Sequence, residues 1–396
     1  MSSGLPKLLI ATEFPPNASG GGPAVVRQLL KDWPSDKLAW WSCLPDDQRP
    51  PELQITIHEV AKIPRKLYPH FRWMGFKGWV LQKVWAPWAA NHLRAMIRQY
   101  RPEVIWTIPN LWSIPPLAQV LPTAAVPYHI TVHDYPDTRQ SQKNMGQERA
   151  RGFLSLVEQL YTQASSRDVI SHEMATDLAA KTGCAAEQIF NAGIEPEDFA
   201  YLEQKKTIGG QTIKIAHAGT IIAEEAFIHL VQSLTRIRQR LSKPVELHLF
   251  GSHSYRERSW FASEWMIEHG NLAPEKFKVA LRECQWGISA MELTDENPRY
   301  NRFSLPSKTV TYLAAGLAII SLGHKDSTIV HLARKHSLGI ALEDGDLNKM
   351  DELLIEGLAE EDAWARYGKS ILRCARSDFD AASMRSLLHA ALGVHH

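Results

Sequence analysis

The stretch KLLIATEFPPNASGGGPAVVRQLLKDW, residues 7 to 33, runs from an apolar segment through a glycine-rich loop into a helical pattern. The apolar segment predicts a buried strand, and we expect the helix to begin at Pro23, since proline is favoured in a first turn. The start of such a helix offers backbone N–H groups to an anionic or hydroxylated ligand. Gly20, Gly21 and Gly22 keep side chains away from that place, so the stretch indicates an α/β fold with a ligand site after its first strand.

Two common phosphate-binding motifs do not fit this loop. A P-loop needs a lysine and a serine or threonine directly after the glycines, and Pro23, Ala24 and Val25 stand there instead. A dinucleotide-binding loop needs spaced glycines, and the three glycines here are consecutive. An ordinary flexible loop between strand and helix is the alternative that this stretch leaves open.

Length and composition indicate a soluble protein of two domains. A chain of 396 residues is long for one hydrophobic core. Its 22% of charged residues and net charge of +1 are ordinary for a globular protein and argue against a general nucleic-acid binder. The four cysteines lie far apart, and the N-terminal apolar run is too short for a signal peptide. We therefore expect a cytoplasmic protein without a disulfide framework.

Short apolar runs alternate with helical patterns along the chain, which is typical of parallel strands joined by crossover helices. Strands are expected at residues 7–12, 37–44, 55–60, 103–108, 128–134, 168–171, 213–219, 245–251, 286–291 and 317–322. The polar stretch 204–212, which contains two glycines, separates two series of strands. We therefore expect two doubly wound domains, residues 1–205 and 206–375, that face a central cleft. Residues 376–396 are expected to form a C-terminal helix that can cross back to the first domain.

Six segments resemble, in the same order, motifs of glycosyltransferase family four, whose members have the GT-B fold. They are EFPPNASGGGPAVVRQLL (13–30), YHITVHDYPD (128–137), IFNAGIEPEDF (189–199), IAHAGTIIAEEAFIHLVQSL (215–234), VELHLFGS (245–252) and RFSLPSKTVTYLAAGLAIIS (302–321). The resemblance implies two Rossmann-like domains, the first binding an acceptor and the second a nucleotide-diphosphate sugar of UDP or GDP type. It also implies transfer with retention of anomeric configuration, and it implies neither a cofactor nor a metal.

The chain departs from the family pattern at a cation pair and at a carboxylate pair of the donor domain. Thr220 and Glu225 stand where the family usually carries an arginine and a lysine. Of the family's two glutamates, the second position is Thr311, and Asn301 or Phe303 stands near the first. A catalytically degenerate subunit that binds a sugar nucleotide is therefore an alternative to an active transferase. Another reaction on the same fold, such as epimerisation, is a further alternative.

The segment around Ser304 and Ser307 predicts a helix start whose N–H groups and dipole would hold the donor diphosphate. Arg302 and Lys308 flank this start, and together they could replace the missing cation pair. Thr311 could still bond a ribose hydroxyl. The residues expected to bind the donor are Gly21, Gly22, Gly219, Thr220, Gly251, Arg302, Ser304, Ser307, Lys308, Thr309 and Thr311.

His133 and Asp134 follow an apolar strand at the edge where an α/β sheet binds its ligand. The family resemblance implies that His133 lies beside the reacting sugar, and an imidazole suits that task because it can donate or accept a hydrogen bond. Asp134 would orient His133 or cap the next turn. We expect both to be catalytic residues, although a purely structural strand-end histidine is the alternative.

Residues 62–101 carry nine lysines or arginines, no aspartate or glutamate, and four tryptophans. Basic residues among interfacial aromatics suit the surface of an anionic membrane or a lipid-diphosphate acceptor. A tryptophan-rich helical hairpin packed on the first domain is the alternative. We thus expect a glycan, lipid-linked or small-molecule acceptor, no nucleic acid, and a cytoplasmic location that includes peripheral contact with the inner face of the membrane.

Overall fold

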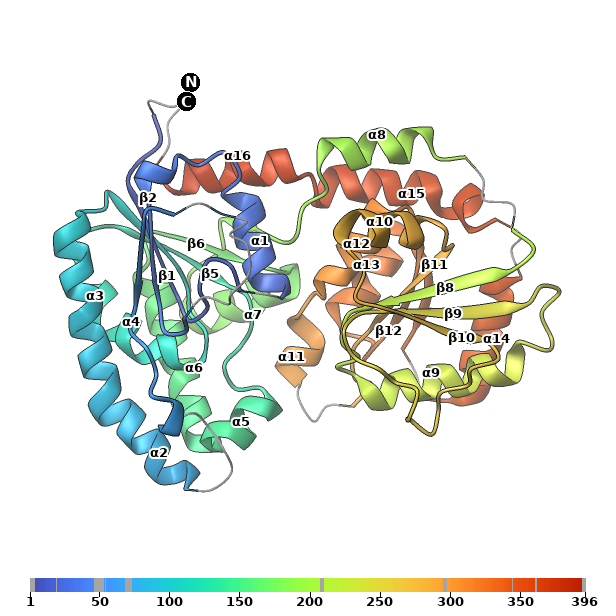
Figure 1. Cartoon of the computed structure of the whole chain (residues 1–396), viewed down its shortest axis with the longest axis horizontal. Coiled ribbons are helices and arrows are strands. Elements are labelled where there is room, and N and C mark those ends of the chain that lie inside the picture. Colours follow the sequence, from blue (N-terminus) through green and yellow to red (C-terminus); the bar gives the residue numbers. More distant parts are fainter. Residues whose placement is uncertain are drawn as a thin grey trace. The chain divides into compact units, whose positions relative to one another are not determined.

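The computed structural model describes residues 4–18, 20–45, 53, 55–67, 73–206, 210–294, 298–343, 345–359 and 362–393. The chain forms two compact units, which Figure 1 shows. The first unit contains Met1–Asn191 and Ser383–His396, and the second contains Ala192–Ala382.

The first unit is built on a parallel sheet with the strand order β3-β2-β1-β4-β5-β6-β7 in the described residues. The strands are β1 (Leu8–Thr12), β2 (Leu38–Ser42), β3 (Ile57–Val60), β4 (Val104–Ile108), β5 (Tyr128–Val132), β6 (Ser166–Val169) and β7 (Gln188–Ile189). Every residue of β1, β2, β4 and β5 is buried, as expected for a sheet covered on both faces. The order reverses between β1 and β4, and such a switch point is where doubly wound sheets bind ligands.

The first unit also contains helices, the last of which comes from the C-terminal end of the chain. They are α1 (Gly21–Leu29), α2 (Met74–Val80), α3 (Ala86–Tyr100), α4 (Ile114–Val120), α5 (Arg139–Met145), α6 (Gln147–Gln163), α7 (His172–Thr182) and α16 (Ala381–Ala391). Turns of 3₁₀ helix lie at Ser35–Lys37, Arg65–Leu67, Leu111–Ser113 and Leu121–Thr123. A π-helical turn, η3 (Leu81–Trp85), joins α2 to α3, so residues 74–100 form one continuous helical run and not the hairpin considered above.

The second unit repeats the architecture with the parallel order β10-β9-β8-β11-β12-β13 in the described residues, so its switch point lies between β8 and β11. Its strands are β8 (Ile213–Ala218), β9 (Val245–Phe250), β10 (Met266–Gly270), β11 (Trp286–Ala290), β12 (Ala318–Leu322) and β13 (Gly339–Leu342). Its helices are α8 (Pro196–Gln204), α9 (Glu224–Ile237), α10 (Pro274–Arg282), α11 (Pro298–Phe303), α12 (Ser307–Ala314), α13 (Thr328–His336), α14 (Leu347–Leu358) and α15 (Ala363–Asp378). No helix of the described residues is apolar over enough length to span a membrane.

Two parallel, doubly wound sheets confirm the predicted fold class. The segment 192–205, expected at the end of the first domain, belongs to the second unit. The reason is that Lys205 Nζ donates to the carbonyls of Ala315 and Gly316, and Arg282 pairs with Asp198 on α8.

The first helix begins at Gly21 and not at Pro23 as expected. Gly20 precedes it with φ +118°, a conformation that favours glycine, and its carbonyl accepts the N–H of Ala24 at 3.2 Å. This bond closes the first turn across residues 20–24, so Pro23 lies inside that turn and not at its start.

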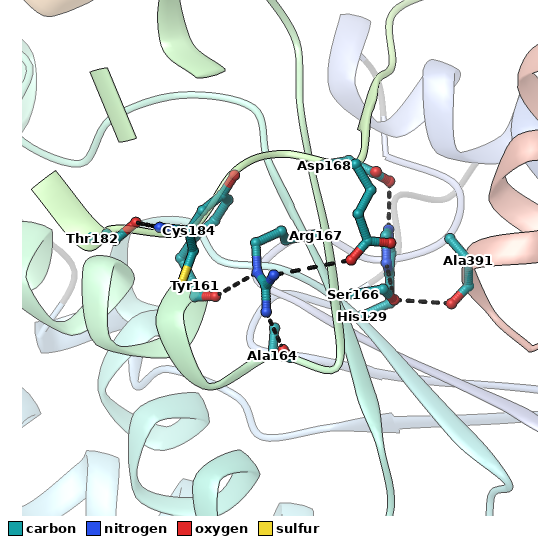
Figure 2. A network of polar contacts seen from close by, with 10 residues as sticks. His129, Tyr161, Ala164, Ser166, Arg167, Asp168, Thr182, Cys184 and Ala391 are labelled. Carbon is teal, nitrogen blue, oxygen red and sulfur yellow. Dashed lines mark hydrogen bonds and ion pairs between the residues drawn. The ribbon is translucent and has the colours of Figure 1, made fainter. Parts of the chain in front are cut away.

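A buried polar network ties the end of α16 to the first sheet (Figure 2). His129 on β5 has its Nδ1 2.8 Å from Ser166 Oγ and its Nε2 2.5 Å from Asp168 Oδ2, both on β6. The Ser166 hydroxyl donates to the carbonyl of Ala391 at 2.9 Å. Because all three side chains are buried and the serine hydroxyl is already engaged, this Ser–His–Asp set is a structural clamp for the C-terminal helix and not a nucleophilic centre.

Candidate active site

Two glycines at the switch-point end of the second sheet pack against each other. Gly219 follows β8 with φ +78°, and its N–H donates to the carbonyl of Phe250 at 2.7 Å. Gly251 follows β9 with φ +146°, and a Cβ added there would lie 3.3 Å from the Cα of Gly219. Both positions therefore require glycine, and the adjoining backbone at 219 and 220 is left exposed.

Lys308 brings a positive charge to this exposed loop. Its Nζ donates to the carbonyl of Thr220 at 3.1 Å, and the Thr220 hydroxyl lies 3.3 Å from His253 Nδ1. Burial lowers the pKa of Lys308 to about 8, so the ammonium group remains mostly protonated at pH 7. The cation at this loop therefore belongs to a different element of the chain, α12.

Helix α12 starts at this same place. Pro306 precedes its first residue, no side chain caps it, and its first turn contains no acidic residue. The N-terminus of such a helix carries a partial positive charge and unpaired N–H groups, which favour an anion. The Tyr312 hydroxyl accepts the N–H of Ala218 at 2.8 Å, which fixes the helix to the end of β8. Gly287 makes room for that ring, since a Cβ there would lie 2.4 Å from Tyr312 Cγ.

His217 lies on β8 beneath the loop. It is 2% exposed, its ring packs edge-on against Phe227, and both ring nitrogens lack a well-formed hydrogen bond. Burial, with a smaller effect of the Lys308 charge, lowers the pKa of His217 well below its usual range, and the nearby backbone of residues 219 and 220 offsets this only in part. In the described residues, this loop region thus combines the Lys308 ammonium group with the neutral imidazole of His217.

The remaining donor-domain residues predicted from sequence have other neighbours. Thr309 is buried with its hydroxyl 2.6 Å from Ser289 Oγ on β11, so its side chain faces the sheet. The Thr311 hydroxyl donates to the carbonyl of Ser307 within α12 at 3.3 Å. Ser304 is buried, and Arg302 lies on α11, where its carbonyl accepts the hydroxyl of Thr328.

Acidic side chains lie at the start of the neighbouring helix α9. Glu224 and Glu225 occupy its first turn, and Arg258 pairs with Glu224 at 3.5 Å. These carboxylates stabilise the helix start, but they repel an anion that approaches it.

In the first unit, Gly22 of α1 lies directly against His133. A Cβ added to Gly22 would meet His133 Nδ1 at 3.3 Å, so the glycine allows the imidazole to approach the start of α1. His133 comes one residue after β5, and burial lowers its pKa to about 4. The ring is therefore neutral at pH 7, with one nitrogen able to donate and the other able to accept. Asp134 is exposed beside it.

Sequence reasoning missed Glu13, which follows β1 at the switch point of the first sheet. It is 4% exposed, its Oε1 accepts the N–H of Trp112 at 3.3 Å, and its carbonyl accepts the N–H groups of Cys43 and Leu44. Burial raises the pKa of Glu13 to about 8. The available signal was an acidic residue placed immediately after a fully buried strand whose first four residues are apolar.

We expect Glu13 to make the stability of the protein depend on pH. Between about pH 5 and pH 8 the folded protein keeps this proton while the unfolded chain has released it, so the free energy of unfolding falls as pH rises through that window. The change is on the order of a few kcal/mol. Glu13→Gln is expected to remove this dependence and to be more stable than the wild type at about pH 8. Urea denaturation at both pH values checks this, and an identical pH dependence in the two proteins would exclude Glu13 as its source.

One group of metal-ligand type occurs in the described residues, at His336, Cys374 and Asp378, whose ligand atoms lie within 4.8 Å of one another. Lys335 Nζ already lies 3.6 Å from Asp378 Oδ2, and burial raises the pKa of the Cys374 thiol to about 12. A nearby cation and a protonated thiol both oppose metal binding, so we assign no metal to this group.

No protein-family model matches the chain, and no curated protein matches it in sequence. Solved structures match its fold. The sucrose-phosphate synthase of Thermosynechococcus elongatus aligns with a TM-score of 0.66 and 15% identity, over 97% of this chain and 98% of that chain. The α,α-trehalose 6-phosphate synthase of Burkholderia multivorans aligns with a TM-score of 0.63 and 11% identity, over 98% and 96%. WaaG, a glycosyltransferase involved in lipopolysaccharide biosynthesis, aligns with a TM-score of 0.63 and 11% identity, over 97% and 99%.

These alignments cover nearly the whole of each chain, so both units take part in the match. The fold is therefore GT-B, the fold of these glycosyltransferases. At such low identity the likeness defines the fold, and the chemistry has to be argued from this chain's own residues.

Proposed function

We propose that the protein is a glycosyltransferase that moves a sugar from a nucleotide-diphosphate sugar to a glycan, a lipid-linked molecule or a small molecule, with retention of anomeric configuration. The observation that carries the proposal is the contact of Lys308 with the loop after β8 at the start of α12. This is the switch-point end of a sheet in a fold whose solved examples include sugar-transferring enzymes.

The donor diphosphate has two negative charges that must be neutralised in a partly buried place. Lys308 supplies a charge-assisted hydrogen bond, and the N–H groups at the start of α12 supply further donors. Gly219 leaves its backbone accessible, because no side chain stands between it and a ligand. The same groups would stabilise the diphosphate as it leaves, which is when its charge is greatest.

In this proposal His133 acts in the sugar-transfer step, and Gly22 leaves room for its imidazole. In that step the bond between the anomeric carbon and the diphosphate oxygen breaks, the acceptor oxygen bonds to that carbon, and the acceptor proton passes to the leaving diphosphate. A neutral His133 would bond sugar hydroxyls or support the charge that develops at the anomeric carbon. We propose that these steps need no metal or cofactor.

We also propose a reducing, cytoplasmic location, because the four cysteines are unpaired.

A sugar-nucleotide binding subunit without catalytic activity is the second candidate. It is favoured by the two carboxylates in the first turn of α9 and by Thr311, whose hydroxyl is engaged within its own helix. Such a protein would bind a donor without consuming it.

A panel of nucleotide sugars, measured by thermal shift, tests the donor assignment. A donor at about 100 times its dissociation constant stabilises the folded state by about 2.7 kcal/mol, so at least one member is expected to raise the melting temperature by a few degrees. The corresponding free nucleoside serves as the control, and it is expected to give a much smaller shift. A panel in which no nucleotide sugar or nucleoside diphosphate stabilises the protein would contradict donor binding.

A further inference from the structure

Large apolar side chains are exposed along one helical run of the first unit. The run consists of α2, the π-helical turn η3 and the start of α3, which Figure 1 shows along one flank of that unit. The exposed side chains are Trp73 (76% exposed), Phe76 (62%), Trp79 (52%), Val84 (58%) and Trp88 (50%). We call these five residues the aromatic face. Single exposed apolar residues are ordinary, whereas a contiguous set marks an interaction surface.

The side chains from Phe76 to Trp88 share one side of the helical run, and Trp73 directly precedes that run with φ +64°. Successive members are three, three, five and four residues apart, which is close to the helical period. The step of five spans the π-helical turn, whose wider hydrogen-bonding pattern accommodates one more residue. Phe76 and Trp79 stack with their ring centroids 6.3 Å apart. On the other side of α3, Ala89, Leu93 and Met96 are buried, so the aromatic face is not needed for the core.

The helical run is also fixed in place. The indole N–H of Trp85 donates to the carbonyl of Lys62 at 3.2 Å, and that of Trp41 on β2 donates to His92 Nδ1 at 3.2 Å. The guanidinium of Arg149 packs directly against Gly78, where a Cβ would lie 2.3 Å from Arg149 Nη1. The aromatic face is therefore presented by a rigid element.

Basic side chains lie on the same helical run and on the segment before it, and no acidic residue occurs between positions 62 and 101. Lys62, Arg65, Lys66 and Lys83 are exposed, and Lys77 is partly exposed. Tryptophan prefers the interface between water and lipid, while lysine and arginine near that interface are attracted to anionic headgroups. The face and its charges thus complement an anionic lipid surface.

A second copy of the chain is a poorer occupant for this surface. A two-fold interface would place each patch against its twin and bring the same cations together, and residues 62–101 contain no acidic side chain to pair with them. We propose that the aromatic face docks the first unit onto an anionic membrane, with the aromatic rings at the headgroup boundary and the flanking lysines and arginines among the headgroups. The proposal does not depend on catalysis.

Co-sedimentation of the full chain with phosphatidylcholine vesicles, with and without phosphatidylglycerol, tests the docking. Binding is expected with phosphatidylglycerol, and it should weaken severalfold when ionic strength rises well above ~0.1 M, because exposed charges are then screened. Pure phosphatidylcholine should bind much less. A wild-type protein that stays in the supernatant with anionic vesicles at low salt would overturn the proposal.

Two double variants assign the binding to this surface. Trp79→Ser with Trp88→Ser, and Lys77→Glu with Lys83→Glu, are each expected to weaken binding by about tenfold or more. The matched controls are Ile222→Ser with Val279→Ser, which are 64% and 61% exposed in the second unit, and Lys276→Glu with Lys369→Glu. The controls should bind as the wild type does, and circular dichroism melts confirm that all variants fold.

Three results would contradict docking of the aromatic face on a membrane. Unchanged binding in both test variants, or an equal loss in the controls, would mean that the aromatic face does not hold the vesicle. A concentration-dependent dimer in light scattering that the Trp79/Trp88 variant abolishes, without vesicle binding by the wild type, would assign the face to a second copy.

Discussion

Replacing His133 with alanine is expected to reduce sugar transfer by ~10²-fold or more while leaving nucleotide affinity nearly unchanged, the usual scale for one positioned catalytic group. The imidazole packs against the start of α1 in the first unit, whereas Lys308 and the loop after β8 belong to the second. Turnover and donor binding should therefore separate. Steady-state kinetics and calorimetric titration on the same preparation measure both.

Gly22→Ala provides a sharper version of this test. The added Cβ would press on His133 Nδ1 at 3.3 Å, so turnover should fall, by less than in His133→Ala. A circular dichroism melt of the same variant separates an effect on turnover from an effect on stability. His172→Ala, an exposed histidine of the same unit, is the control and should be fully active. Full transfer activity in His133→Ala would remove His133 from the mechanism.

The activity profile should also reflect the unusual pKa of His133. Because burial lowers this pKa to about 4, the imidazole stays neutral throughout the neutral range and gains a proton only near that pH. Protonation of His133 should therefore reduce the rate of sugar transfer only near pH 4, and not near the usual histidine pKa of about 6.5. The rate of transfer measured as a function of pH checks this.

Replacing Lys308 with alanine is expected to weaken nucleoside-diphosphate binding by about 1–3 kcal/mol, or roughly 5-fold to 150-fold, because a charge-assisted hydrogen bond is lost in a partly buried place. The nucleoside without phosphates should bind nearly as before. Isothermal titration with both ligands separates the two effects. Unchanged diphosphate affinity would mean that Lys308 does not hold the phosphates.

The pKa of Lys308 adds a pH signature. The protonated ammonium binds the diphosphate, and burial has lowered its pKa to about 8, so affinity should fall as pH rises through that value. The alanine variant should lack this decline. Thr309→Ala is the matched control on the same helix, since its hydroxyl faces Ser289 and not the loop.

Arg302→Ala tests the sequence prediction that the Arg302 guanidinium also holds the diphosphate. Unchanged diphosphate affinity in this variant would assign the binding charge to Lys308 alone.

Most of the fold could be predicted because the central strands are unambiguous. β1, β2, β4 and β5 are runs of five buried residues, and they give a strong apolar signal. The edge strand β10 was missed because Glu268 and His269 interrupt its apolar pattern. β13, at the other edge, has only four residues and begins at a glycine, so its local signal is equally weak.

The candidate site could be predicted only in part. Lys308 follows from the helix motif, but its contact with Thr220 joins residues 88 positions apart, and no local pattern indicates such a contact. Thr309 was assigned to the donor although its side chain packs toward β11, because helix phase relative to the sheet is decided by tertiary packing. Glu13 was missed because its raised pKa results from burial in the folded unit, which the tertiary packing decides and no local pattern indicates.

Glycosyl transfer itself is the most direct test of the account. Purified protein is incubated with the stabilising nucleotide sugar and with glycan, lipid-linked and small-molecule acceptors, while release of the nucleoside diphosphate is followed and the anomeric configuration of the product is read by NMR. We expect stoichiometric nucleoside diphosphate and glycosylated product, with the donor's configuration retained and with slower turnover in the His133→Ala and Lys308→Ala variants. A donor that binds and remains intact with every acceptor and in water would contradict a transferase and indicate the binding subunit.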